Sequence, residues 1–178
     1  MDSFFIRPEL PEDNEAIFEV NLQAFGQDGE ARLVDALRAD GNINPELSLV
    51  AVHGERIIGH ILFCPVAIVC GDRETSALAL APLAVHQDYQ CRGIGAALIE
   101  VGLNECQRLG HRIVIVVGHP GYYPRFGFTV AKESGISAPF PCPDEAFMAL
   151  PLEPGALDGI CGMVRYPDAF DAVGAHTS

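Results

Sequence analysis

The chain of 178 residues lacks any apolar run of the roughly 18 residues that a membrane-spanning helix needs. Its first residues, MDSFFIRPELPED, carry acids where a signal peptide carries a basic segment and a longer apolar one. It also lacks an internal repeat, a low-complexity linker and a convincing domain boundary. With 49% hydrophobic residues and a mean hydropathy of +0.21, the composition is typical of a globular protein. We therefore expect a soluble, cytoplasmic protein with one domain over residues 1–170 and a flexible tail over 171–178.

Basic residues are scarce, because 11 Lys and Arg stand against 24 Asp and Glu, which gives a net charge of −13. Such a surface repels the phosphates of nucleic acids, so we expect no nucleic-acid partner. It would attract a cationic substrate such as an amine. The same charge is also explained if the acids only keep the protein soluble.

The six cysteines form no C-x-x-C pair and have no histidines at metal-ligand spacing; they stand at positions 64, 70, 91, 106, 142 and 161. This pattern favours reduced thiols over a disulfide framework or a zinc site, and we expect no metal.

The most informative stretch spans residues 78–110. An apolar run ends at Val85, and a polar turn with Gln90, Arg92, Gly93 and Gly95 follows it. Apolar side chains then recur at three- and four-residue steps, as in an amphipathic helix: Ile94, Ala97, Leu98, Val101 and Leu109. The pattern predicts a strand, a glycine turn and a helix.

This junction has the properties of an anion site. The first amides of a helix have no intrahelical partner, and the helix dipole places positive charge there. Gly93 and Gly95 remove side chains where phosphates would touch the backbone, and Arg92 adds a permanent charge. A tight turn without a ligand can look the same. The dinucleotide fingerprint fails, because Leu98 stands where the third glycine belongs, and a P-loop fails for lack of Gly-Lys-Ser/Thr.

The spacing that fits is Q-x-x-G-x-G, since residues 90–95 read QCRGIG after the strand. Here the chain resembles the GNAT superfamily of acyl-CoA-dependent N-acetyltransferases, in which this signature marks the pyrophosphate loop. Residues 123–128, YPRFGF, are similar to the family's Tyr-x-x-x-Gly-Phe segment. The resemblance covers residues 4–130 well. It implies an α/β (α+β) fold, with a mostly antiparallel sheet and a central parallel pair of splayed strands flanked by helices.

Periodicity and turn residues predict the remaining elements. We expect helices at 11–25, 30–40 and 122–126, and strands at 4–8, 47–53, 56–69, 75–85, 112–117, 128–130, 146–152 and 160–166. Pro82 falls inside one strand and predicts a bulge, because proline cannot donate a ladder hydrogen bond.

The resemblance implies that acetyl-CoA is the acyl donor. The residues that would hold it are Leu83, Ala84, Val85, Gln90, Cys91, Arg92, Gly93, Ile94, Gly95, Ala96 and His119. An acyl-enzyme on Cys91 is disfavoured, because the loop would grip the pyrophosphate far from the thioester.

The resemblance places a general acid at Tyr123, whose phenol could protonate the departing thiolate. Tyr122 is the second choice, and a purely structural Tyr123 packed under Phe126 and Phe128 is the alternative. A backbone amide near Val85 is the candidate for stabilising the oxyanion.

The general base is open among Glu30, His60 and His119. Glu30 opens a helix, where an acid also simply favours the helix dipole. His60 lies in the middle of a strand, where a core histidine is at least as common as a base.

These observations predict an N-acetyltransferase that transfers acetyl to a primary amine by direct attack in a ternary complex. The acceptor would be a small molecule or a protein amino group, and a homodimer is compatible with the resembling family. A non-catalytic acyl-CoA sensor or interaction module on the same fold is the alternative. A Rossmann-type oxidoreductase is the third choice.

Overall fold

The computed structural model describes residues 3–173. Its strands are β1 (Phe5–Pro8), β2 (Ser48–His53), β3 (Arg56–Cys70), β4 (Arg73–Val85), β5 (Ile113–Val117), β6 (Thr129–Val130), β7 (Ile136–Ser137), β8 (Phe147–Pro151) and β9 (Gly162–Arg165). Its α-helices are α1 (Asn14–Phe25), α2 (Gly29–Ala39), α3 (Ile94–Arg108) and α4 (Ala169–Ala172). The helices and strands expected from the sequence are confirmed within a few residues. The sequence did not predict α4, the two-residue β7 or the 3₁₀ helices Pro45–Leu47, Gln87–Tyr89, Ala131–Ser134 and Asp144–Ala146.

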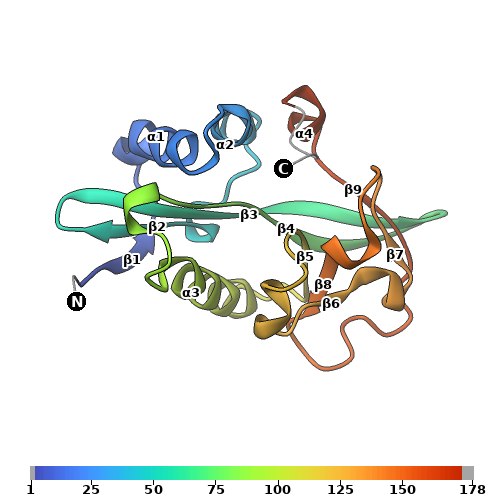
Figure 1. Ribbon diagram of the computed structural model, residues 1–178. Helices are drawn as coiled ribbons and strands as arrows, with labels where there is room; N and C mark the ends of the chain where they lie inside the picture. The colour runs from blue at the N-terminus through green and yellow to red at the C-terminus, as the bar shows by residue number, and fades with distance from the viewer. Residues whose placement is uncertain (1–2, 174–178) are drawn as a thin grey trace.

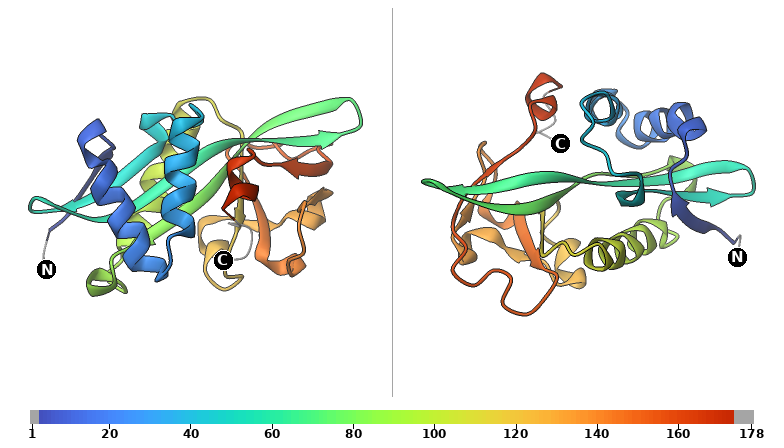
Figure 2. Two further views of the ribbon diagram at one scale, coloured as in Figure 1. Left: turned by 90° about the horizontal axis from the view of Figure 1, so that it is seen from above. Right: turned by 180° about the vertical axis from the view of Figure 1, so that it is seen from behind.

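One mixed sheet separates two layers of helices. Its strand order is β1-β2-β3-β4-β5-β8-β6, and β9 joins both β3 and β7. The pairing β4–β5 is parallel, as is the two-residue contact between β7 and β9, and the other pairs are antiparallel. Helices α1, α2 and α4 lie on one side of the sheet and α3 on the other (Figures 1 and 2).

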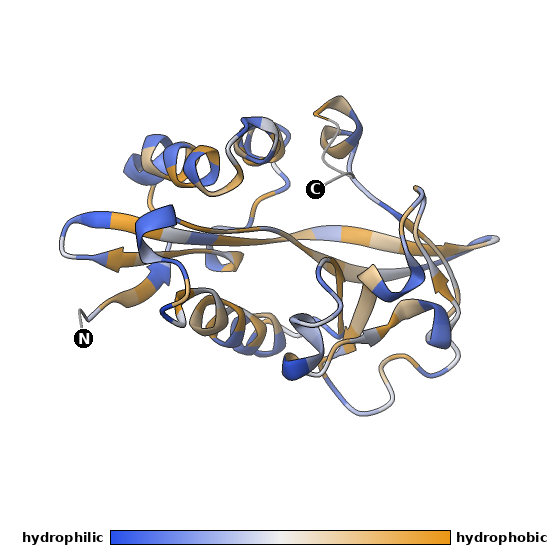
Figure 3. Cartoon of the chain, in the orientation of Figure 1, coloured by the Kyte–Doolittle hydropathy of each residue, from blue (hydrophilic) through white to orange (hydrophobic). Residues whose placement is uncertain are grey.

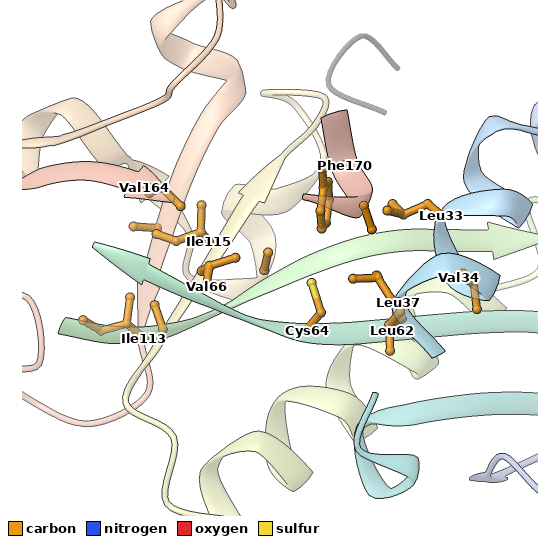
Figure 4. Packing of buried hydrophobic residues seen from close by; sticks show 14 of the residues in the cluster. Leu33, Val34, Leu37, Leu62, Cys64, Val66, Ile113, Ile115, Val164 and Phe170 are labelled. Atoms are coloured by element: carbon orange, nitrogen blue, oxygen red, sulfur yellow. The ribbon is translucent and has the colours of Figure 1, made fainter. Parts of the chain in front are cut away.

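The long strand β3 supplies both faces of the core, because successive side chains of a strand point to opposite sides. Leu62 and Cys64 pack under α1 and α2, whereas Ile61 and Phe63 pack over α3. The ribbon coloured by hydropathy shows apolar strands between amphipathic helices (Figure 3). Figure 4 shows how side chains from α2, α4, β3, β5 and β9 meet in the first of these clusters.

Helix α3 buries Ile94 and Leu98 as expected, but its buried stripe differs at one expected position. Val101 is exposed, so its assignment to the apolar face is corrected. The buried positions are Ile94, Leu98, Ile99, Gly102 and Cys106. Gly102 explains the difference, because the Phe63 ring occupies the space of a side chain there.

The splayed strand pair follows from the pairing of β4. The β3–β4 register shifts between Ile61 and Phe63, opposite the stretch that holds Pro82, so the expected bulge is confirmed. Strand β5 pairs with β4 only at Leu78 and Ala79. Past this point the two strands diverge and leave a slot that opens toward the start of α3.

No helix in the described range 3–173 is both long and apolar enough to cross a bilayer. Of the tail expected at 171–178, residues 171–172 complete α4, and 174–178 lie outside the described residues.

Candidate active site

The glycine turn between β4 and α3 presents a helix N-terminus without a side-chain cap. Gly93 is the N-cap residue, with φ of 81°, and no side chain of the described chain bonds the first amides of α3. Cys91 also has a left-handed φ, of 61°, which residues other than glycine rarely adopt. Gln90 holds the loop to the strand end, since its Nε2 donates to the Val85 carbonyl over 3.1 Å. The turn therefore presents free amides in a fixed concave arrangement, as an anion site requires.

The two glycines of the turn are needed for different reasons. A Cβ on Gly93 would meet open space, so glycine serves the backbone conformation there. A Cβ on Gly95 would lie 3.2 Å from the Tyr122 hydroxyl and 3.7 Å from the Val85 side chain. Gly95 therefore allows Tyr122 to approach the first turn of α3.

The other expected donor-binding residues lie around this turn. Arg92 is exposed, with its guanidinium carbon 5.3 Å from the Tyr89 ring centroid. Ile94 is buried in the core and can offer only its backbone amide, whereas Ala96 is half-buried in the first turn of α3. On β4, Leu83 and Val85 are half-buried and Ala84 between them is buried.

A cavity of about 340 Å³ lies where the slot meets α1 and α2. Its polar side chains are Glu30, His119, Tyr122 and Tyr123. The rest of its wall is mainly apolar and comes from Phe25, Leu33, Leu80, Ala81, Pro82, Leu83, Val117 and Gly118. Residues expected to take part thus meet here from three separate stretches of the sequence: Glu30, Leu83, and the pair His119 and Tyr123.

A larger cavity of about 650 Å³ lies on the other side of the loop, beside Phe4, His53 and Arg92. None of the residues that line it belongs to β4 or β5. Because the slot does not open into it, we place the chemistry in the smaller cavity.

Tyr123 begins the 3₁₀ helix Tyr123–Phe126 and is buried to 8% exposure. Its ring packs edge-on against Tyr122 and Phe128, with centroids 5.2 and 5.7 Å away. Gly118 makes room for it, since a Cβ there would overlap the ring. Burial, and then the neighbouring Tyr122, raises the pKa of Tyr123 to about 12. The phenol is therefore protonated at neutral pH, the state a general acid needs.

Tyr122 reaches from the same segment toward α3. Burial raises its pKa, and Arg125 partly offsets that effect. The Arg125 guanidinium carbon lies 4.3 Å from the ring centroid, a cation–π contact that fixes the ring.

Glu30 is 4% exposed although it lies in the first turn of α2. Its carboxylate meets only the Gln27 amide among the described contacts, at 3.5 Å to both oxygens. The carboxylate thus faces the cavity and forms no cap with helix amides in this part of the chain. His119 is exposed at the other wall, and its Nδ1 accepts from the Gly121 amide over 3.0 Å, which places the proton of a neutral ring on Nε2.

His60 lies outside the cavity and is fully buried. Its Nδ1 lies 3.1 Å from the Asn21 amide nitrogen and its Nε2 2.9 Å from the Ser48 hydroxyl. Ser48 in turn donates to Glu9, which pairs with Arg38. Burial, and then the charge of Arg38, lowers the pKa of His60 to about 3. The structure favours the core-histidine interpretation, and we do not assign His60 as the base.

Sequence reasoning missed several residues that shape the cavity. Phe25 and Leu33 come from α1 and α2, and no local motif marks them. Gly118 could have been noticed, because a glycine that ends a buried strand shortly before two tyrosines is a signal of close ring packing.

The slot between the splayed strands leads from an uncapped helix N-terminus to a cavity with a phenol and a carboxylate. This arrangement defines an acyltransferase that uses a phosphate-bearing acyl carrier. The family model for the acetyltransferase (GNAT) domain matches residues 6–131, and the chain belongs to this family.

Two relatives match three quarters or more of the chain. The uncharacterized N-acetyltransferase YhbS of Escherichia coli is 35% identical over 167 residues, which cover 93% of this chain and 98% of the relative. The uncharacterized N-acetyltransferase YjhQ of Escherichia coli is 42% identical over 135 residues, 75% of this chain and 74% of the relative.

Two solved structures are also similar. The crystal structure of Escherichia coli YhbS in complex with CoA has a TM-score of 0.90 and 33% identity, covering 96% of this chain and 93% of that one. A GNAT family acetyltransferase from Brucella melitensis in complex with acetyl-CoA has a TM-score of 0.79 and 35% identity, covering 96% and 100%.

Proposed function

We propose that this N-acetyltransferase transfers acetyl from acetyl-CoA to a small primary amine, by direct attack while both substrates are bound. The observation that carries the proposal is the continuity of three features: uncapped α3 amides, a slot between β4 and β5, and a cavity with Glu30 and Tyr123 at its end. The donors of the two structural relatives, CoA and acetyl-CoA, support the choice of carrier.

In this proposal the first amides of α3 and Arg92 bind the pyrophosphate, because they combine the helix dipole with a permanent charge. Residues Leu83 and Val85 line the slot and direct the thioester arm toward the cavity. The edge of β4 that β5 leaves beyond Ala79 provides backbone amides near Val85 for the oxyanion.

Glu30 takes a proton from the acceptor ammonium, directly or through water, so that the amine nitrogen can attack the thioester carbon. When the carbon–sulfur bond breaks, Tyr123 donates its proton to the thiolate and is reprotonated by the second proton that the nitrogen loses. The products are an amide, a free thiol and one released proton. His119 lies on the opposite wall and is the second candidate for the base.

The cavity also limits the acceptor. Glu30 is the one carboxylate among its lining residues, and most of the remaining wall is apolar. At about 340 Å³ the cavity is near the lower end of ligand-site volumes. A small amine with an apolar body fits this wall, and its cationic form would be drawn to Glu30.

Donor binding is tested by calorimetric titration of acetyl-CoA. Arg92→Glu and Gly93→Asp should weaken binding roughly 10- to 100-fold, since each places a carboxylate beside the pyrophosphate. Arg73→Glu is the matched charge reversal, in the exposed turn at the far end of β4. Equal affinity in all four proteins would refute the loop assignment.

The catalytic roles are tested by thiol release across a panel of primary amines. Tyr123→Phe should lower kcat roughly 100-fold without weakening acetyl-CoA binding, because it removes only the acid. Tyr166→Phe, which deletes a phenol outside the cavity, is its control. Glu30→Gln should lower kcat without weakening acetyl-CoA binding, because it removes only the base, whereas the exposed Glu100→Gln should leave kcat unchanged. A normal kcat in Glu30→Gln would transfer the base role to His119.

A further inference from the structure

Two cysteines that lie 91 positions apart in the sequence meet at one edge of the sheet. Cys70 ends β3 and Cys161 immediately precedes β9. Their Sγ atoms are 3.1 Å apart, and both side chains are exposed. No other pair of cysteine sulfurs is in contact within residues 3–173.

The backbone around the pair is built for close approach. Strand β9 runs antiparallel to the end of β3, with Val69 opposite Met163 as the last pair before the cysteines. Gly162 has φ of 131°, and a Cβ there would overlap the Val69 carbonyl and lie 3.1 Å from the Cys70 Cβ. Continuing this register places Cys70 opposite Gly162, with Cys161 one position further along, and the absence of a side chain on Gly162 lets the two cysteines approach. The sulfurs, 3.1 Å apart, need to approach by only about 1 Å to reach the length of a disulfide bond.

We propose that Cys70 and Cys161 are a redox-responsive pair that a low-molecular-weight disulfide, such as glutathione disulfide, converts into an intramolecular disulfide. The thiolate of one cysteine attacks the oxidant and releases one glutathione thiol. The thiolate of the other attacks the resulting mixed disulfide and releases the second. The two protein thiols are oxidised and the oxidant is reduced to two thiols, so that electrons and protons balance.

The remaining cysteines differ from this pair in access and in partners. Cys64 and Cys106 are buried, and burial raises the pKa of each thiol to about 12, so neither supplies a thiolate at neutral pH. Cys142 is half-buried. Cys91 is exposed in the donor loop but has no sulfur beside it within residues 3–173. Selective reaction at the 70–161 pair follows from exposure combined with proximity.

The bond would act on the C-terminal part of the fold. Strand β9 is joined to β3 by only three residue pairs. Val164 of β9 and Phe170 of α4 nevertheless pack in the core cluster with Leu33 of α2, as Figure 4 shows. A covalent bond at the start of β9 would hold this short ladder closed, and the opening of β9 would become rarer.

The experiment oxidises the purified full chain with glutathione disulfide and follows it by intact mass, peptide mapping and hydrogen exchange. We expect the monomer to lose about 2 Da, to give one cross-linked peptide joining residues 70 and 161, and to regain its mass with dithiothreitol. Exchange of the β9 amides should slow about tenfold or more in the oxidised protein.

Cys70→Ser and Cys161→Ser should each abolish the cross-link, whereas Cys142→Ser should leave it intact. Both serine substitutions fall on exposed side chains, so folding is retained. A mixed disulfide that persists on either cysteine, a bond between two copies of the chain, or an unchanged mass would overturn the proposal. None of these outcomes depends on acetyl transfer.

Discussion

His60 gives a quantitative prediction about stability against pH. The imidazole is fully buried between Asn21 and Ser48, and the nearest charges in its network are those of Glu9 and Arg38. Its pKa falls from 6.5 to about 3 because burial and then Arg38 disfavour the cation. The unfolded chain therefore binds a proton near pH 6.5 that the folded chain does not bind until about pH 3.

The sign follows from linkage. The contribution of a neutral His60 is fully present above pH 6.5 and is lost as the pH falls toward 3. Each pH unit in this window costs about 1.4 kcal/mol, so at pH 5 the loss is roughly 2 kcal/mol. Carboxylates with ordinary pKa values near 4 contribute little above pH 5. Burial also lowers the pKa of His111, so the contribution of His60 has to be isolated by comparison with a variant that lacks it.

Urea unfolding at pH 7.5 and pH 5.0 measures this loss. The wild-type protein should lose about 2 kcal/mol more of its free energy of unfolding between the two pH values than His60→Gln, which cannot titrate. The glutamine variant will be less stable at both pH values. The decisive quantity is therefore how much the free energy of unfolding of each protein falls between pH 7.5 and pH 5.0. An equal fall in the two proteins would mean that His60 gains its proton readily in the folded protein, as a base open to the cavity would. The assignment of His60 to the core would then be refuted.

Three further predictions concern close packing and a buried ion pair. Gly102→Ala should lower the free energy of unfolding in urea by about 1–3 kcal/mol despite the better helix propensity of alanine, because the Phe63 ring fills that space. Asn104→Ala on the same helix is the control, and a stabilised Gly102→Ala would contradict the packing. Gly118→Ala should lower kcat while acetyl-CoA affinity stays within about twofold, because the new Cβ would displace the Tyr123 ring; a loss of affinity alone would contradict this. Asp13→Asn should cost about 1–3 kcal/mol at pH 7, since Asp13 accepts two bonds from Arg7 at 2.6 and 3.0 Å. Because these bonds lower the pKa of Asp13, the cost should vanish as the pH falls through that lowered value, which acid titration of both proteins measures.

The donor side of the site could be predicted from sequence because it is local. About a dozen consecutive residues hold the strand end, Gln90, Gly93 and the first turn of α3. The residue type at each of these positions indicates its conformational role. The bulge at Pro82 could be predicted for the same reason, since a proline inside a strand disturbs the hydrogen-bond ladder whatever surrounds it.

The acceptor side could not be predicted in the same way, because its wall comes from α1, α2, β4 and the segment after β5. Glu30 had two interpretations in the sequence, and its position facing the cavity depends on how α2 packs on the sheet. For His60 the deciding facts are its partners, Asn21 and Ser48, which lie 39 and 12 residues away. The stripe of α3 shows the same limit, since Val101 and Ile99 are both apolar and only the Phe63 ring against Gly102 selects between them.

The two tyrosines connect the donor loop to the reaction site. Gly95 on α3 admits the Tyr122 hydroxyl, and Gly118 at the end of β5 admits the Tyr123 ring. The two rings also pack edge-on against each other, with centroids 5.2 Å apart. The 3₁₀ helix that begins at Tyr123 is therefore held against α3 through one ring and against the end of β5 through the other. Because a close-packed interior transmits displacement, the placement of the phenol depends on the same helix terminus that would hold the diphosphate. The α3 terminus therefore helps to position the phenol through Tyr122, whereas displacement of the Tyr123 ring alone leaves the backbone amides of that terminus in place.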